Sequence, residues 1–159
     1  MLFRSIDSSF GLAFAKSQMA AGFKVPKAGN VFISVQDRHK AGILDVAGQM
    51  ERLGFKILAT AGTAKYLNDQ GISAAKVNKV SEGRPHVLDH IKNGDTQMVI
   101  NTSVGRKSSQ DAYWIRHGAL TYNIIYTTPL AGARALAEAA KALAGKDWGV
   151  RPLQEYHQV

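Results

Sequence analysis

Apolar residues along the chain recur with two alternating spacings. Short apolar runs bounded by glycine or polar residues are typical of strands buried on both faces, whereas apolar residues every three or four positions indicate amphipathic helices. The short runs predict strands at 30–35, 55–60, 75–80, 96–102 and 122–128. The helical spacing predicts helices at 8–21, 39–54, 63–71, after Pro85 within 81–94, at 108–120 and at 129–145.

Five strands that alternate with helices predict the α/β class. We expect a Rossmann-like, three-layer α/β/α sandwich around a five-stranded parallel sheet. With 159 residues the chain has the length of one domain. We expect a helix and linker in 1–28, the α/β domain in 29–145 and a tail in 146–159, irregular or with a short helix.

Charge and composition narrow the class of partner. Lys and Arg outnumber Asp and Glu by 20 to 12, a formal net charge of +8, which favours an anionic partner. The basic residues form no run of five, so we expect a small phosphorylated ligand and no nucleic acid. No apolar run approaches the ~20 residues of a membrane span, the amino-terminal residues lack a signal-peptide pattern, and cysteine is absent. We therefore expect a cytoplasmic protein without membrane contact.

Polar residues follow each predicted strand, where ligands of open parallel sheets bind. Strand three itself is expected to carry Asn78 and Lys79. The groups after the other strands include Ser34 and Gln36 to Lys40, Thr60 to Thr63, Asn101 to Ser103 with Gly105 to Lys107, and Tyr126 to Thr128.

The stretch ILATAGTAKYL (57–67) passes directly from a strand to a helix. Free amides at a helix start attract anions, and Gly62 lets a ligand approach the backbone. The hydroxyls of Thr60 and Thr63 and the charges of Lys40 and Lys79 complete a phosphate site. Taken singly, the same residues also fit helix caps, a turn glycine and solvated lysines.

Two further groups of residues fit either a functional role or a purely structural one. His86, Asp89 and His90 would share a helix face and could bind a metal, but a capped helix start without metal is favoured. Asp111 either orients a ligand or makes an exposed pair with Lys107. Tyr113 and Trp114 are expected in the core or an interface, and no nucleophilic triad has convincing spacing.

Several motifs together resemble the carboxyl-terminal regulatory domain of carbamoyl phosphate synthase large chains, which has a methylglyoxal-synthase-like fold. They are FISVQDRHK, ILATAGTAKYL, VNKVSEGRPHVLDHIKNG, VINTSVGR and IRHGAL, in that order. The segment SIDSSFGLAFAKSQMAAG resembles the lead-in to that domain, whereas MLFR departs from it. The resemblance covers about Ile6 to His157.

The resemblance implies a regulatory domain that binds nucleoside monophosphates, UMP as an inhibitor and IMP as an activator. It also implies that ornithine activation is transmitted at the edge matched by Tyr126 and Thr128, where Thr127 replaces an acid found in the family. The matching phosphate and ribose contacts are Lys40, Thr60, Gly62, Thr63, Lys79 and Asn101. The rest of the nucleotide pocket corresponds to Ser34, Thr102, Ser103, Asp111 and Ile115.

The same resemblance implies a larger assembly. The full ligase of the family uses ATP with Mg or Mn, bicarbonate and ammonia from a glutaminase small chain to make carbamoyl phosphate for pyrimidines and arginine. This chain would be a regulatory part of its large chain, without catalysis or a cofactor of its own. Which nucleotide binds, and whether the isolated chain oligomerises, stays open.

Two alternative functions remain in view. Methylglyoxal synthase has the same phosphate corner, but its acid–base residues are absent where this chain has SEGRPH and NTSVGRKSS, so we expect no lyase activity. A general polyanion binder would instead bind any oligonucleotide with a steep dependence on salt.

Overall fold

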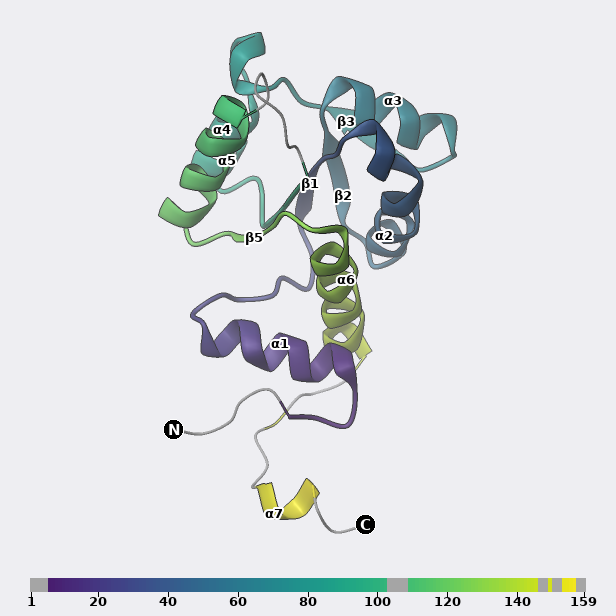
Figure 1. Cartoon of the computed structure of the whole chain (residues 1–159), viewed down its shortest axis with the longest axis vertical. Helices are drawn as coiled ribbons and strands as arrows, with labels where there is room; N and C mark the ends of the chain where they lie inside the picture. Colours follow the sequence, from purple (N-terminus) through teal and green to yellow (C-terminus); the bar gives the residue numbers. More distant parts are fainter. Residues whose placement is uncertain (1–5, 103–108, 146–148, 150–152, 157–159) are drawn as a thin grey trace.

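A parallel five-stranded sheet forms the centre of the molecule (Figure 1). The structure, a computed structural model, describes residues 6–102, 109–145, 149 and 153–156. All neighbouring strands pair in parallel, in the order β3-β2-β1-β4-β5, so the predicted α/β class and the five-stranded parallel sheet are confirmed. The strands are β1 (Asn30–Ser34), β2 (Lys56–Ala59), β3 (Ala74–Lys76), β4 (Met98–Asn101) and β5 (Ile125–Thr127).

Helices precede, connect and follow the strands close to where the apolar spacing predicts them. None of those among the described residues combines the length and apolar character that crossing a bilayer requires. The α-helices are α1 (Phe10–Ala20), α2 (Lys40–Arg52), α3 (Ala61–Asp69), α4 (Val87–Lys92), α5 (Ser109–Thr121), α6 (Leu130–Gly145) and α7 (Leu153–Tyr156). Two short 3-10 helices, η1 (Asp37–His39) and η2 (Val80–Glu82), follow β1 and β3.

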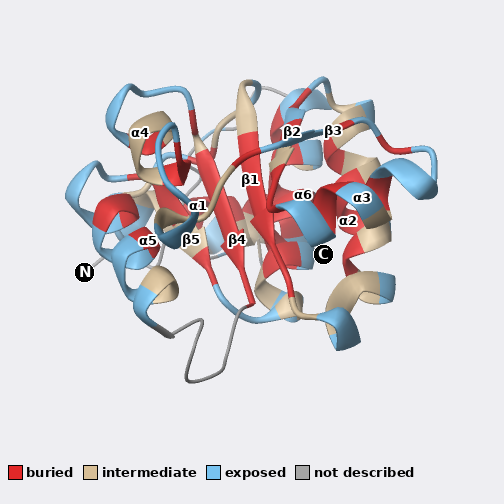
Figure 2. Ribbon diagram, turned by 90° about the horizontal axis from the view of Figure 1, so that it is seen from above, coloured by how far each residue is buried: buried red, intermediate tan, exposed pale blue. Residues whose placement is uncertain are grey.

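The helices cover both faces of the sheet, which explains the continuous apolar strand runs (Figure 2). On one face α2, α3 and α6 pack over a core that contains Val31 and Ile33 of β1. On the other face α4 and α5 pack over a core that contains Phe32, because successive strand residues point to opposite faces. The three residues are fully buried, so β1 is apolar on both sides.

The amino-terminal helix belongs to the same packed unit as the sheet. Leu12 and Ala15 of α1 are buried in the core cluster that includes α6. The two helices approach so closely at Gly11 that a Cβ there would lie 2.5 Å from the carbonyl oxygen of Glu138. A glycine is therefore required at this crossing. The boundary expected at residue 28 therefore separates two segments that share one hydrophobic core.

The sheet grows outward from β1 to β3, and the chain then returns to place β4 on the other side of β1. The gap between the carboxyl ends of β1 and β4 is therefore the topological switch point, the usual ligand position in such sheets. Ser34 and Asn101 stand side by side there in the β1–β4 register. The edge of the sheet at which these two strands end is therefore the expected position of a ligand.

The prediction that Asn78 and Lys79 lie on strand three is wrong. Strand β3 ends at Lys76, and Asn78 instead forms an isolated parallel bridge with His86. The carbonyl of Asn78 accepts the Val87 amide at 3.1 Å, so the chain pairs with the start of α4 after leaving the sheet. Lys79 is consequently a loop residue that precedes η2 as its N-cap.

Candidate functional site

The corner between β2 and α3 keeps its helix start free of side-chain caps. Helix α3 begins at Ala61, so Gly62 and Thr63 lie in its first turn. Thr60 is the N-cap residue, but its side chain makes no capping hydrogen bond. Its buried hydroxyl lies instead 3.3 Å from the Thr63 hydroxyl. The first-turn amides are left for an outside acceptor, and helix starts attract anions.

Thr63 connects this corner to the neighbouring strand. Its hydroxyl oxygen accepts the amide of Val35, just after β1, at 3.3 Å. Thr63 is only 1% exposed, so its main role is to fix the corner against β1 rather than to face solvent. This arrangement holds the start of α3 at the carboxyl edge of the sheet.

Lys40 brings a positive charge to the same corner from the first turn of α2. A Cβ placed on Gly62 would meet the Lys40 Nζ at 3.9 Å as its nearest atom. The Lys40 ammonium also pairs with the exposed Asp37 carboxylate at 2.7 Å and lies 5.9 Å from the centre of the Tyr66 ring. The hydrogen bond from Lys40 lowers the pKa of Asp37. An anion at the corner would compete with Asp37 for Lys40.

Thr102 closes the switch point from β4. Its amide donates to the Ser34 carbonyl at 3.0 Å, which continues the β1–β4 ladder by one residue. Its hydroxyl accepts the Gln36 amide at 3.4 Å and lies 2.9 Å from Nδ1 of His39. Ser34, Asn101 and Thr102 are all at least 95% buried, so polar side chains line the inside of this edge.

Tyr126 of β5 extends the polar wall beside Asn101. Burial raises the pKa of the Tyr126 phenol, and hydrogen bonds with Arg116 and Asn101 partly offset that rise. The Arg116 guanidinium also lies 5.9 Å from the centre of the Tyr126 ring. The partly buried phenol is therefore protonated at neutral pH and provides a neutral hydroxyl next to the switch point.

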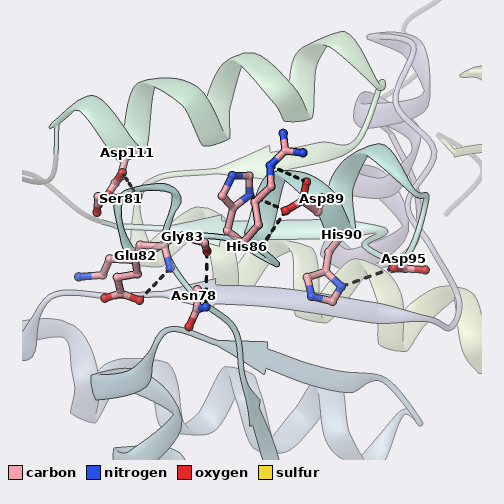
Figure 3. A network of polar contacts seen from close by, with 11 residues as sticks. Asn78, Ser81, Glu82, Gly83, His86, Asp89, His90, Asp95 and Asp111 are labelled. Carbon is pink, nitrogen blue, oxygen red and sulfur yellow. Dashed lines mark hydrogen bonds and ion pairs between the residues drawn. The ribbon is translucent and has the colours of Figure 1, made fainter.

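Lys79 is the N-cap of η2, and Asp111 and Ile115 belong to α5, which lies on the other side of the sheet from α2 and α3 (Figure 2). Asp111 accepts the Ser81 amide at 3.1 Å and the Ser81 hydroxyl at 2.8 Å (Figure 3). It thereby ties α5 to η2. Ile115 is 2% exposed and packs in the core with Phe32.

Ser103 and Lys107 lie outside the described residues, as do the glycine and arginine between them. By accepting hydrogen bonds from Ser81, the Asp111 carboxylate links α5 to η2, a structural role that the sequence did not indicate. The roles of Lys79, Asp111 and Ile115 toward a nucleotide stay predictions.

His86, the N-cap of α4, and His90 within α4 lie near different carboxylates. His86 Nδ1 lies 3.1 Å from Asp89, whereas His90 Nδ1 lies 3.5 Å from Asp95 (Figure 3). Asp89 also accepts the His86 amide at 2.9 Å and so caps the start of α4. Within the described part of the chain, no three acidic or histidine residues converge as metal ligands would.

Sequence reasoning did not select His39 or Tyr126 as part of the nucleotide pocket. Both belong to the polar groups at the ends of the predicted strands one and five, so the sequence alone places them at the carboxyl edge of the sheet. Their contacts with Thr102 and Asn101 come from a different strand, and no local spacing reveals them.

Comparison with known proteins places the chain in a family. The profile of the MGS-like domain matches residues 42–128. The chain is 45% identical over 97% of its length to "Carbamoyl phosphate synthase large chain, C-terminal section" of Aquifex aeolicus. It is 48% identical over 95% of its length to the carbamoyl phosphate synthase large chain of Mesorhizobium japonicum, and 47% identical over 96% to that of Pseudomonas putida.

This chain spans only 30% of the Aquifex protein and 13% and 14% of the other two relatives. The similarity thus covers nearly the whole chain but a small part of each large chain. The chain belongs to the MGS-like domain family and is homologous to the C-terminal section of carbamoyl phosphate synthase large chains.

Proposed function

We propose that this chain is the regulatory part of a glutamine-dependent carbamoyl phosphate synthase large chain and that it binds nucleoside monophosphates. UMP acts as the inhibitor and IMP as the activator at one shared site. The chain has no catalytic activity of its own; ATP with Mg or Mn, the glutaminase small chain and the rest of the large chain belong to the complete ligase. Homology to such large chains supports this function.

The observation that carries the proposal is the uncapped start of α3 next to Lys40. Thr60 leaves the first-turn amides free of a side-chain cap, and Gly62 has no Cβ in front of them. A phosphate at this corner would accept amide hydrogens and replace Asp37 as the partner of Lys40. By the family match, Lys79 would bind the same phosphate from the loop that precedes η2.

The buried polar wall between β1 and β4 suits the rest of the nucleotide. Ser34, Asn101 and Thr102 supply hydroxyl and amide groups for the ribose and base, together with Ser103, Asp111 and Ile115 from the family match. Ser34, Asn101 and Thr102 sit at the switch point, where open parallel sheets bind their ligands. This position favours a small nucleotide over an extended polyanion.

Regulation then follows from linkage. A nucleotide that binds one arrangement of the whole ligase better than another shifts the population toward it, by no more than the difference in binding free energy. The edge at Tyr126 and the amino-terminal segment are the proposed coupling surface, and ornithine activation would pass through the same edge.

The proposal is tested by calorimetric titration of this chain with UMP, IMP, ribose 5-phosphate and inorganic phosphate, at low and high salt. We expect saturable binding at one site, discrimination between UMP and IMP, and only partial loss of affinity in salt. Absence of binding by all four ligands would contradict the proposal. Equal binding of any oligonucleotide, with a steep salt dependence, would favour the polyanion binder.

A second assay addresses the lyase alternative. Incubation of the chain with dihydroxyacetone phosphate should give no more methylglyoxal than a heat-inactivated sample. Formation well above that control would replace the regulatory function with methylglyoxal synthase chemistry.

A further inference from the structure

His39 ends η1 at the switch point and contacts the buried hydroxyl of Thr102. The distance from His39 Nδ1 to Thr102 Oγ1 is 2.9 Å, and the Gln36 amide donates to the same oxygen at 3.4 Å. Thr102 is 2% exposed, so no bulk water competes for its hydroxyl. The hydrogen-bonding capacity of this one hydroxyl can therefore be counted.

A hydroxyl has one hydrogen and two acceptor positions. When His39 is neutral and its Nδ1 carries no proton, the Thr102 hydroxyl must donate its only hydrogen to Nδ1. Gln36 fills one acceptor position, so the hydroxyl has no hydrogen left for a ligand. When Nδ1 is protonated, it donates to the Thr102 oxygen instead. His39 and Gln36 then fill both acceptor positions of that oxygen, and the hydroxyl hydrogen is available to donate to a ligand.

We propose that His39 is a positioning residue that controls whether Thr102 can donate a hydrogen bond to a nucleoside monophosphate, so that protonation of His39 and nucleotide binding favour each other. This inference rests on the proposed function, because it concerns the same nucleotide site. It names a pH-dependent regulation of that site and a residue outside the set expected from the family.

The charges around His39 strengthen this coupling. Asp37, Arg38 and Lys40 lie on the same turn, and Arg134 of α6 comes within 3.8 Å of a Cβ placed on Gly42 in the first turn of α2. Lys40 already pairs with Asp37, and among the described residues His39 makes no ion pair. A phosphate bound beside Lys40, the residue that follows His39, would add a negative charge to this turn and so favour the protonated imidazole relative to the empty site.

The experiment compares UMP affinity of the unchanged chain and of His39→Asn at about pH 8.0 and about pH 5.5, on either side of the usual histidine range. Asn can hydrogen-bond at the position of Nδ1 but does not titrate. Because UMP phosphate itself titrates near pH 6, the readout is the affinity of the unchanged chain divided by the affinity of His39→Asn at the same pH. We expect that ratio to rise about fivefold on acidification, the effect of roughly one hydrogen bond.

A second measurement uses only the unchanged chain and so needs no variant to fold. The nitrogen chemical shifts of His39, measured by NMR, should show the neutral tautomer with Nδ1 unprotonated, and UMP added at about pH 6.5 should convert it toward imidazolium. A neutral tautomer with a proton on Nδ1 would overturn the inference, because Thr102 would then be free to donate at every pH.

The outcomes separate the two proposals. If UMP binds both proteins with a ratio independent of pH, the inference about His39 is wrong and the nucleotide site stands. If UMP fails to bind at either pH, the proposed function itself fails, and the inference falls with it. The inference is supported if acidification raises the affinity of the unchanged chain relative to His39→Asn. The same comparison between Thr102→Val and the double variant Thr102→Val/His39→Asn should then show no such rise.

Discussion

Two helix starts of this molecule, those of α3 and α4, have opposite surroundings. At α4 the Asp89 carboxylate accepts the His86 amide at 2.9 Å and has Arg84 and His86 nearby, so the chain supplies its own anion. At α3 there is no acidic residue in the first turn, and the N-cap Thr60 makes no side-chain cap. The nearest charge to Gly62 is the Lys40 ammonium.

The difference teaches that a helix start becomes an anion site only where the chain does not fill it. Both starts carry the same backbone amides and the same dipole. Asp89 neutralises one of them, whereas the other is bordered by a cation and two mutually bonded hydroxyls. The following changes break or sharpen this contrast, in order of expected effect.

The largest effect should come from placing a carboxylate at the start of α3. We expect Gly62→Glu to weaken UMP binding by about 3 kcal/mol, roughly a hundredfold, because it brings an anion next to the bound phosphate. Calorimetry measures the affinity, and thermal unfolding checks the fold. Gly62→Ala is the matched control: its Cβ meets only Lys40 Nζ, at 3.9 Å, so its effect should be much smaller. Equal losses in both variants would contradict an anion at this corner.

Removal of the Lys79 ammonium, at the N-cap of η2, should have the next largest effect. We expect Lys79→Ala to weaken UMP binding by about 1.5–3 kcal/mol, the range for a hydrogen bond to a charged group. Lys76→Ala removes an exposed lysine from the end of β3 and serves as the control. Calorimetric affinities that are the same for both variants would remove Lys79 from the site.

At α4 the expected effect falls on stability and not on binding. The backbone hydrogen bond from His86 lowers the pKa of Asp89, and the charges of His86, Arg84 and His90 lower it further. A lowered folded-state pKa stabilises the protein above the unfolded value of about 3.9, and this stabilisation is lost as pH falls through the folded value. Asp89→Asn should therefore unfold at lower urea concentration at pH 7, with unchanged UMP affinity.

The control for Asp89 is the pH dependence itself. The difference in urea midpoint between Asp89→Asn and the unchanged chain should shrink as the pH is lowered below about 4. A difference that stays constant with pH would mean that the ionised carboxylate is not the stabilising group.

The smallest effect is expected at Asp37. This exposed carboxylate competes with a bound phosphate for Lys40, so Asp37→Asn should tighten UMP binding about twofold, as expected for an exposed ion pair. Asp45→Asn, an exposed change on α2, is the control and should leave the calorimetric affinity unchanged. Weaker binding in Asp37→Asn would mean that Asp37 orients Lys40 rather than competing for it.

Part of the candidate site was predictable, because parallel strands bring their carboxyl ends to one edge. The corner at Thr60, Gly62 and Thr63 and the pair Ser34 and Asn101 were selected on that ground, and the structure brings them to that edge. The partner of Asp111 was not predictable, since Ser81 lies 30 positions earlier. The sequence predicts Lys79 on a strand because an apolar run gives no sign of where pairing with the next strand stops.

The sequence by itself determined the α/β class, the number of strands and the edge at which polar residues gather, because burial on both faces of a sheet requires continuous apolar runs and alternating helices. Only the tertiary structure decided which polar groups are already satisfied and which helix start stays open. Those choices depend on contacts such as Val35 with Thr63 and His39 with Thr102, which join residues 28 and 63 positions apart. Local spacing cannot specify such pairs, because packing against a third element decides where each side chain points.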